Sequence, residues 1–255
     1  AEVLLDEFSA AVAKAQRNTH ARLAASWTRQ PSGEDWHFET DPPRLFAVTD
    51  QVAEQVAGSL PAYVATLHGS RRGLMARYRV RDVAFRVVGT GSVGLRSYVV
   101  LLQGNGEEAL VLQVKQARPS ALAAHLATAP CRHEGERIVR GARLMQAESD
   151  LLMGWTTTND TPFVVRQFRN RKAAIDPTLL RRRDLIAYGR LAAALLARAH
   201  SRSIDVRLLA AYLGAAREFD TAIARYAHRY ADQTEHDHAA LTVAVRTGQI
   251  AATVE

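Results

Sequence analysis

The spacing of apolar residues changes twice along the chain. Residues 2–27 and 50–78 carry apolar side chains at helical spacing, and Pro61 is expected to divide the second stretch into two helices. From Arg79 the pattern is that of short strands, and after Asp176 it is helical again almost to the end. The expected parts are a mostly helical segment, a lobe that contains a sheet, and a second helical segment, at residues 1–78, 79–170 and 171–255.

The middle part is expected to hold five strands and one helix. The five runs with strand pattern are 80–88, 96–104, 109–117, 151–155 and 162–168. Asn105-Gly106 lies between the second and third runs and is a strong hairpin signal. A helix fits residues 133–150, between the third and fourth runs. The predicted fold class is α+β, with a five-stranded antiparallel sheet over about residues 80–168, one inserted helix and flanking helical segments.

Composition limits the classes of protein to consider. The chain has 255 residues, of which 47% are hydrophobic, so it can bury a substantial core. Cys131 is its single cysteine, which excludes an internal disulfide and a cysteine-rich metal site. No apolar run reaches the roughly 18 residues that cross a bilayer. A cytoplasmic protein without a membrane partner is expected.

Arginine supplies nearly all of the positive charge. The formal net charge is +7, and of 33 basic residues only Lys14, Lys115 and Lys172 are lysines. Nucleic-acid binding is not predicted, because no aromatic residues alternate with the basic ones. Since the chain uses arginine almost everywhere, each lysine is a candidate for a specific role.

Gly89, Gly91 and Gly94 form a G-x-G-x-x-G pattern between two expected strands. A dinucleotide fold would need a helix after these glycines, and a Walker loop would need Gly-Lys-Ser/Thr before a helix. A glycine-rich hairpin over ATP phosphates, as in protein kinases and aminoglycoside phosphotransferases, fits the pattern. Ser92 lies inside the loop, where its hydroxyl could contact a phosphate or form a turn. The alternative is a loose β-turn with no ligand.

Lys115 and Glu136 extend this hypothesis. Lys115 lies on the third expected strand, where a kinase-like lobe places the lysine that holds the phosphates. Glu136 follows on the next helix, where such a lobe places the partner carboxylate, and we expect it to approach the ammonium. The alternatives are a solvent-facing lysine and an ordinary glutamate in the first turn of a helix.

Several motifs resemble a known family. The motifs are "VVGTGSVGLRSYVVLLQG", "LVLQVKQARPS", "HEGERIVRGARLMQAESDLLMGWT", "FVVRQFRNRK", "LARAHSRS" and "YADQTEHDHAAL". Together they resemble the C-terminal half of the bacterial domain-of-unknown-function family 2252, whose members are similar to the protein-kinase-like superfamily. The resemblance covers about residues 1–250 and is strongest from Asp82 to Trp155.

The resemblance implies that residues 79–170 form a kinase-like nucleotide-binding lobe with ATP as its ligand. The upstream half of the family carries a Gly-Asp-Ala-His stretch and an Asp-rich stretch, and neither is present in this chain. The expected partner is therefore that missing N-terminal half, with Mg²⁺ held by residues outside this chain. An exposed apolar surface is expected near Gly91 and Lys115, where the missing half would close the cleft.

The sequence is consistent with three functions. The chain is an ATP-binding lobe of a phosphotransferase, a nucleotide-binding module without catalysis, or a purely structural module. Whether it is an enzyme depends on the missing half, and no catalytic residue is assigned. Residues 235–238 (Glu-His-Asp-His) fit a solvated helix face better than a metal site, because neighbours on one turn point in different directions. No metal site is predicted.

Overall fold

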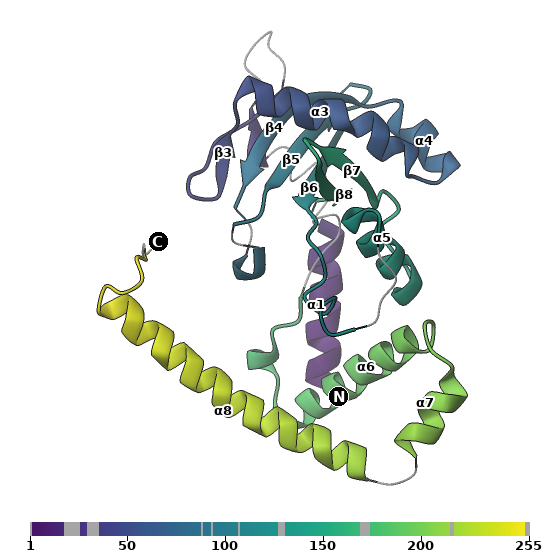
Figure 1. The fold of residues 1–255 in the computed structure, drawn as a ribbon, viewed down its shortest axis with the longest axis vertical. Coiled ribbons are helices and arrows are strands. Elements are labelled where there is room, and N and C mark those ends of the chain that lie inside the picture. The colour runs from purple at the N-terminus through teal and green to yellow at the C-terminus, as the bar shows by residue number, and fades with distance from the viewer. Residues whose placement is uncertain are drawn as a thin grey trace. The chain divides into compact units, whose positions relative to one another are not determined.

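The chain is a mixed α+β protein with seven α-helices and antiparallel sheets among its described residues (Figure 1). The computed structural model describes residues 2–17, 26–29, 36–87, 89–92, 94–106, 108–126, 131–168, 174–214 and 217–252. Two compact units emerge, Ala1–Ser203 and Ile204–Glu255. The first unit contains every strand described below.

The main sheet has six antiparallel strands in the order β3-β4-β5-β6-β8-β7. Their bounds are Leu45–Ala47 (β3), Arg79–Arg86 (β4), Ser97–Gln103 (β5), Ala109–Gln116 (β6), Gly154–Thr158 (β7) and Thr161–Gln167 (β8). Strands β1 (Thr28–Arg29) and β2 (His37–Phe38) form a separate two-stranded ribbon.

The expected number of five strands was wrong, because β3 adds a sixth at the edge of the sheet beside β4. A three-residue strand is too short to show an alternating pattern in the sequence. Leu45 is buried, and its pairing with Arg86 joins segments far apart in the chain. The antiparallel α+β class and the single helix inserted between β6 and β7 are confirmed.

Apolar side chains cover both faces of the sheet. Leu112 and Val114 of β6 point to one face and pack in a cluster with α3 (Asp50–Ala65). Val111 points to the other face and packs near Phe38 and Phe168. Because both faces are buried, β6 is apolar along most of its length instead of alternating.

Helix α3 lies across the first face, as Figure 1 shows. Its buried residues include Val56, Leu60 and Tyr63, and the Tyr63 hydroxyl donates to the carbonyl oxygen of Leu152 at 2.7 Å. Burial raises the pKa of Tyr63 above its usual range, so the hydroxyl stays protonated and remains a donor.

Pro61 does not divide this helix as expected. Residues on both sides of it, Leu60 and Tyr63, are anchored in the core, and this packing outweighs the hydrogen bond that proline cannot make. The chain leaves the helix only after Ala65, and α4 (Gly69–Met75) follows.

Helix α5 (Glu134–Met145) packs on the opposite face through Val139 and Val164. His133 caps its first turn, with Nδ1 accepting a hydrogen bond from the backbone N–H of Glu136 at 3.2 Å. Gly135 allows close approach, since an added Cβ would lie 2.5 Å from the Phe163 carbonyl oxygen. The first turn of α5 is therefore held directly against the strand β8.

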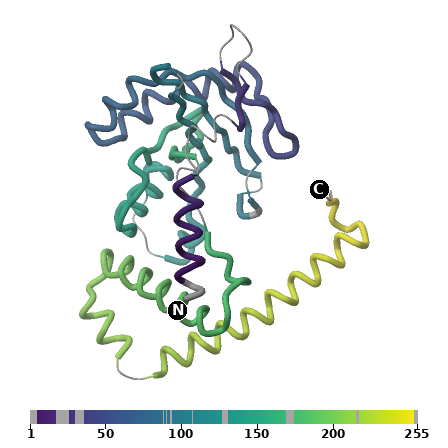
Figure 2. Tube along the Cα trace, turned by 180° about the vertical axis from the view of Figure 1, so that it is seen from behind, coloured from purple at the N-terminus to yellow at the C-terminus, as the bar shows by residue number. Residues whose placement is uncertain are grey.

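The other helices are α1 (Glu2–Arg17) and α6 (Arg182–His200) in the first unit and α7 (Val206–Leu213) and α8 (Glu218–Arg246) in the second. Figure 2 shows α8 as one continuous helix. Residues 235–238 are all exposed on it. None of the described helices combines the length and the apolar character that a membrane span requires.

Candidate glycine loop site

The loop between β4 and β5 contains the three glycines of the G-x-G-x-x-G pattern. A single turn of 3₁₀ helix, Thr90–Ser92, lies inside it. The backbone N–H of Ser92 donates to the Gly89 carbonyl oxygen at 2.8 Å, and that of Leu95 donates to the Ser92 carbonyl oxygen at 3.0 Å. The Ser92 amide is therefore hydrogen-bonded within the turn, and its hydroxyl is the group that can contact another residue or a ligand.

The three glycines of this loop differ in backbone conformation and in the space around them. Gly94 has φ +79°, a left-handed conformation that side chains rarely adopt. Gly89 and Gly91 have no such φ, and a Cβ added at either would meet nothing within 4 Å. Open space therefore adjoins the backbone at Gly89 and Gly91, and no contact in the described structure explains why these two positions are glycine.

Lys115 lies beneath this loop. Strand β6 pairs it with Ser97 on one side and Val164 on the other. Its Nζ donates to the Ser92 hydroxyl oxygen at 2.5 Å, and the contact is partly buried. This hydrogen bond thus joins Lys115 of β6 to the glycine loop, 23 residues earlier in the sequence.

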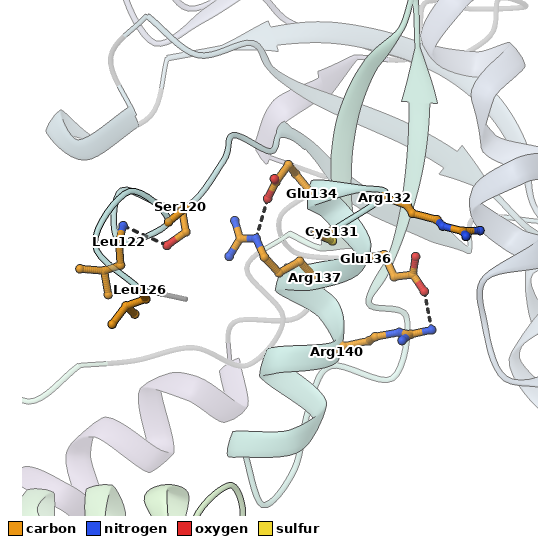
Figure 3. Close-up of a pocket in the computed structure, with 10 residues that line it drawn as sticks. Ser120, Leu122, Leu126, Cys131, Arg132, Glu134, Glu136, Arg137 and Arg140 are labelled. Atoms are coloured by element: carbon orange, nitrogen blue, oxygen red, sulfur yellow. Dashed lines mark hydrogen bonds and ion pairs between the residues drawn. The ribbon is translucent and has the colours of Figure 1, made fainter. Parts of the chain in front are cut away.

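Glu136 has a different partner from the one expected. Its carboxylate lies 2.6 Å from Nη2 of Arg140, one turn later on α5, and Glu134 pairs in the same way with Arg137 at 2.5 Å (Figure 3). Among the residues that the structure describes, no ion pair joins Lys115 to Glu136. The structure therefore brings Lys115 and Ser92 together and holds Glu136 elsewhere.

Sequence reasoning missed Arg140 and Arg137. The signal was present, because Glu136 and Arg140 are four residues apart and Glu134 and Arg137 are three apart on one helix. Within α5 each arginine competes with any outside partner, such as Lys115, for the carboxylate of its glutamate. The sequence prediction considered the carboxylates without the arginines one turn later, so it did not include these ion pairs.

One exposed apolar side chain adjoins the loop among the residues that the structure describes. It is Val87, which follows β4 and is 47% exposed. No group of three or more His, Cys, Asp or Glu side chains suited to a metal ion occurs in the described part of the chain.

Fold and site together define an α+β protein whose antiparallel sheet carries a glycine-rich hairpin with a lysine beneath it. The chain belongs to the family described as an uncharacterized protein conserved in bacteria (DUF2252), whose model matches residues 2–244, nearly the whole chain. No curated protein and no solved structure matches it. The expected family is thus confirmed, whereas the likeness to protein kinases and the placement in the C-terminal half remain predictions.

Proposed function

We propose that the chain is the ATP-binding lobe of a protein-kinase-like phosphotransferase. The contact between Lys115 and Ser92 carries this proposal, because it places an ammonium under a glycine-rich loop. A phosphate at this position would lie among the Lys115 ammonium, the Ser92 hydroxyl and the loop backbone.

Lys115 has donors to spare for such a ligand. An ammonium has three N–H donors, and Ser92 supplies the one acceptor that the described structure gives it. The remaining donors suit phosphate oxygens, which form strong charge-assisted hydrogen bonds. The space beside Gly89 and Gly91 would let the backbone approach the same oxygens.

The order of elements also supports the proposal. A hairpin (β4–β5), a third strand with a lysine (β6), a helix with a glutamate (α5) and two further strands (β7 and β8) follow one another as in a kinase small lobe. The resemblance further implies that the catalytic base and the Mg²⁺ ligands come from outside this chain. No residue of this chain is assigned either role.

A purely structural role is the competing account, and one observation favours it. Both Lys115 and Glu136 already have partners within the chain, Ser92 and Arg140, so neither needs a ligand to satisfy it. A nucleotide-binding module without catalysis is the intermediate case. Direct binding measurements separate these accounts.

The experiment is isothermal titration of ATP into the wild-type chain and into the Lys115→Ala variant. We expect the variant to lose affinity at least about tenfold, because a hydrogen bond to a charged group contributes about 1.5–3 kcal/mol and tenfold is about 1.4 kcal/mol. Lys14→Ala, an exposed lysine of α1, is the matched control and should bind as wild type does. Absence of ATP binding to the wild type, or equal binding by Lys115→Ala, would favour the structural account.

A further inference from the structure

His133 connects the start of helix α5 to the strand β7. Its Nδ1 accepts a hydrogen bond from the backbone N–H of Glu136 at 3.2 Å, and its Nε2 lies 3.0 Å from Oγ1 of Thr157. The helices α3 and α7 are capped by oxygen atoms, those of Thr49 and Asp205, which keep their protonation state between pH 5 and pH 8. The cap of α5 is instead an imidazole, which titrates within this range.

The two hydrogen bonds determine which nitrogen of the ring carries the hydrogen. Nδ1 can accept from Glu136 only if it has a free lone pair, so the imidazole is neutral and its hydrogen is on Nε2. Nε2 is then the donor, and Oγ1 of Thr157 is its acceptor. Both contacts of the ring are therefore satisfied in a single protonation state.

A second proton on this ring would bind to Nδ1. The new N–H would then face the N–H of Glu136, and because both groups are donors the cap bond would be lost. The added positive charge would also lie at the N-terminus of α5, where the helix dipole disfavours cations. The bond from Nε2 to Thr157 could persist, so protonation would separate the ring from α5 and not from β7.

The charged groups around the ring lie on its own segment. Glu134 and Glu136 follow it, and carboxylates favour a protonated imidazole, but each is paired with an arginine of α5 at 2.5 and 2.6 Å. Arg132 precedes it and has the opposite effect. From β7 the ring meets Thr157 and Trp155, whose ring centroid is 6.5 Å away, and both are uncharged. The described contacts place no charged side chain of β7 or β8 at the ring.

The capped turn is packed closely against the sheet. A Cβ added at Gly135 would lie 2.9 Å from Cε1 of His133, 2.9 Å from Cβ of Trp155 and 2.5 Å from the carbonyl oxygen of Phe163. The imidazole therefore lies between the first turn of α5 and the strand β7. Loss of the cap bond acts directly on the turn that attaches α5 to β7 and β8.

We propose that His133 is an acid-sensitive cap, which attaches the first turn of α5 to β7 when its imidazole is neutral and releases that turn when the imidazole is protonated. An imidazole in an unfolded chain gains its proton near pH 6.5. Because the capped state excludes that proton, the stability that the cap provides is present at pH 8 and is lost as the pH falls toward 5. The cap contains neither Ser92 nor Lys115, so it does not depend on the proposed function.

Urea denaturation of the wild type and of His133→Asn at several values between pH 8 and pH 5 tests the proposal. Asparagine is a strong N-cap residue that does not titrate, so the urea midpoint of the wild type should fall relative to that of His133→Asn as the pH is lowered. His228→Asn, at an exposed histidine of α8, is the matched control and should follow the wild type at every pH. A difference between the wild type and His133→Asn that is the same at pH 8 and pH 5 would overturn the proposal.

Nitrogen NMR of the wild type is a second test that needs no variant. At pH 8 the imidazole signals of His133 should show the hydrogen on Nε2. On acidification the backbone amide signal of Glu136 should shift along the same titration curve as the ring, because the two groups share the cap bond. A hydrogen on Nδ1 at pH 8, or a Glu136 amide that does not respond while the ring gains its proton, would contradict the acid-sensitive cap.

Discussion

Ser92 and Lys115 show how a short loop can be attached to a sheet through one polar contact. The ammonium is partly buried, and a buried charge is costly unless it is hydrogen-bonded. Ser92 provides that bond and fixes the position of the loop above β6. A neutral hydroxyl is a weaker partner than a phosphate, so the same contact leaves the lysine available for an anion.

Substitutions of two loop glycines should affect the stability of the fold and the affinity for ATP separately. Gly94→Ala should lower the free energy of unfolding by about 1–2 kcal/mol, because alanine is strained at φ +79°. Gly91→Ala should leave stability nearly unchanged, since its Cβ would meet nothing, but should weaken ATP binding by keeping the backbone from the phosphates. Urea denaturation and ATP titration of both variants check this. A loss of stability in Gly91→Ala without a loss of affinity would contradict it.

The position of α5 depends on a close contact at Gly135. In Gly135→Ala the new methyl group would lie 2.5 Å from the Phe163 carbonyl oxygen and 2.9 Å from Cβ of Trp155. We expect the helix to move off β8 and the free energy of unfolding to fall by about 1–3 kcal/mol, as in other overpacked sites. Chemical denaturation measures the change.

Gly141→Ala is the matched control on the same helix. Gly141 has nothing within 4 Å of an added Cβ, so alanine there should stabilise the helix by about 0.5–1 kcal/mol. If Gly135→Ala were as stable as Gly141→Ala, α5 would not be held against the sheet as described.

The elements of the lobe could be predicted from the sequence where the signal is local. The strands β4, β5 and β6 and the helix α5 follow from runs of β-branched residues, the Asn105-Gly106 turn and helical spacing. The strand β3 and the continuity of α3 through Pro61 depend on contacts between distant segments. Tertiary packing determines both the formation of β3 and the continuity of α3, and no local sequence pattern predicts such packing.

The candidate site, like the fold, could be predicted only in part from the sequence. The loop and Lys115 were identified from spacing and residue type, and their proximity follows from two consecutive hairpins. The partner of Glu136 was missed because two carboxylates and two arginines share the first two turns of α5, and the choice among them depends on side-chain geometry.

At the scale of the whole molecule, most of the exposed large apolar residues lie outside the part of the chain that forms the buried core. The three buried clusters draw on residues between Trp27 and Phe168. Many of the exposed large apolar residues, Leu208 and Tyr226 among them, lie after Ser203 in the second unit. The sheet and its two covering helices therefore contain the packing that holds the glycine loop and Lys115 in place.

The central claim is that this chain binds nucleotide through its phosphates, and a series of affinities tests it most directly. Adenosine, AMP, ADP and ATP are titrated into the wild type and into Lys115→Ala. The account predicts that affinity for the wild type rises with each added phosphate, and that Lys115→Ala flattens this rise while its binding of adenosine is unchanged. Equal affinity of the wild type for adenosine and ATP, or an unaltered rise in Lys115→Ala, would contradict it.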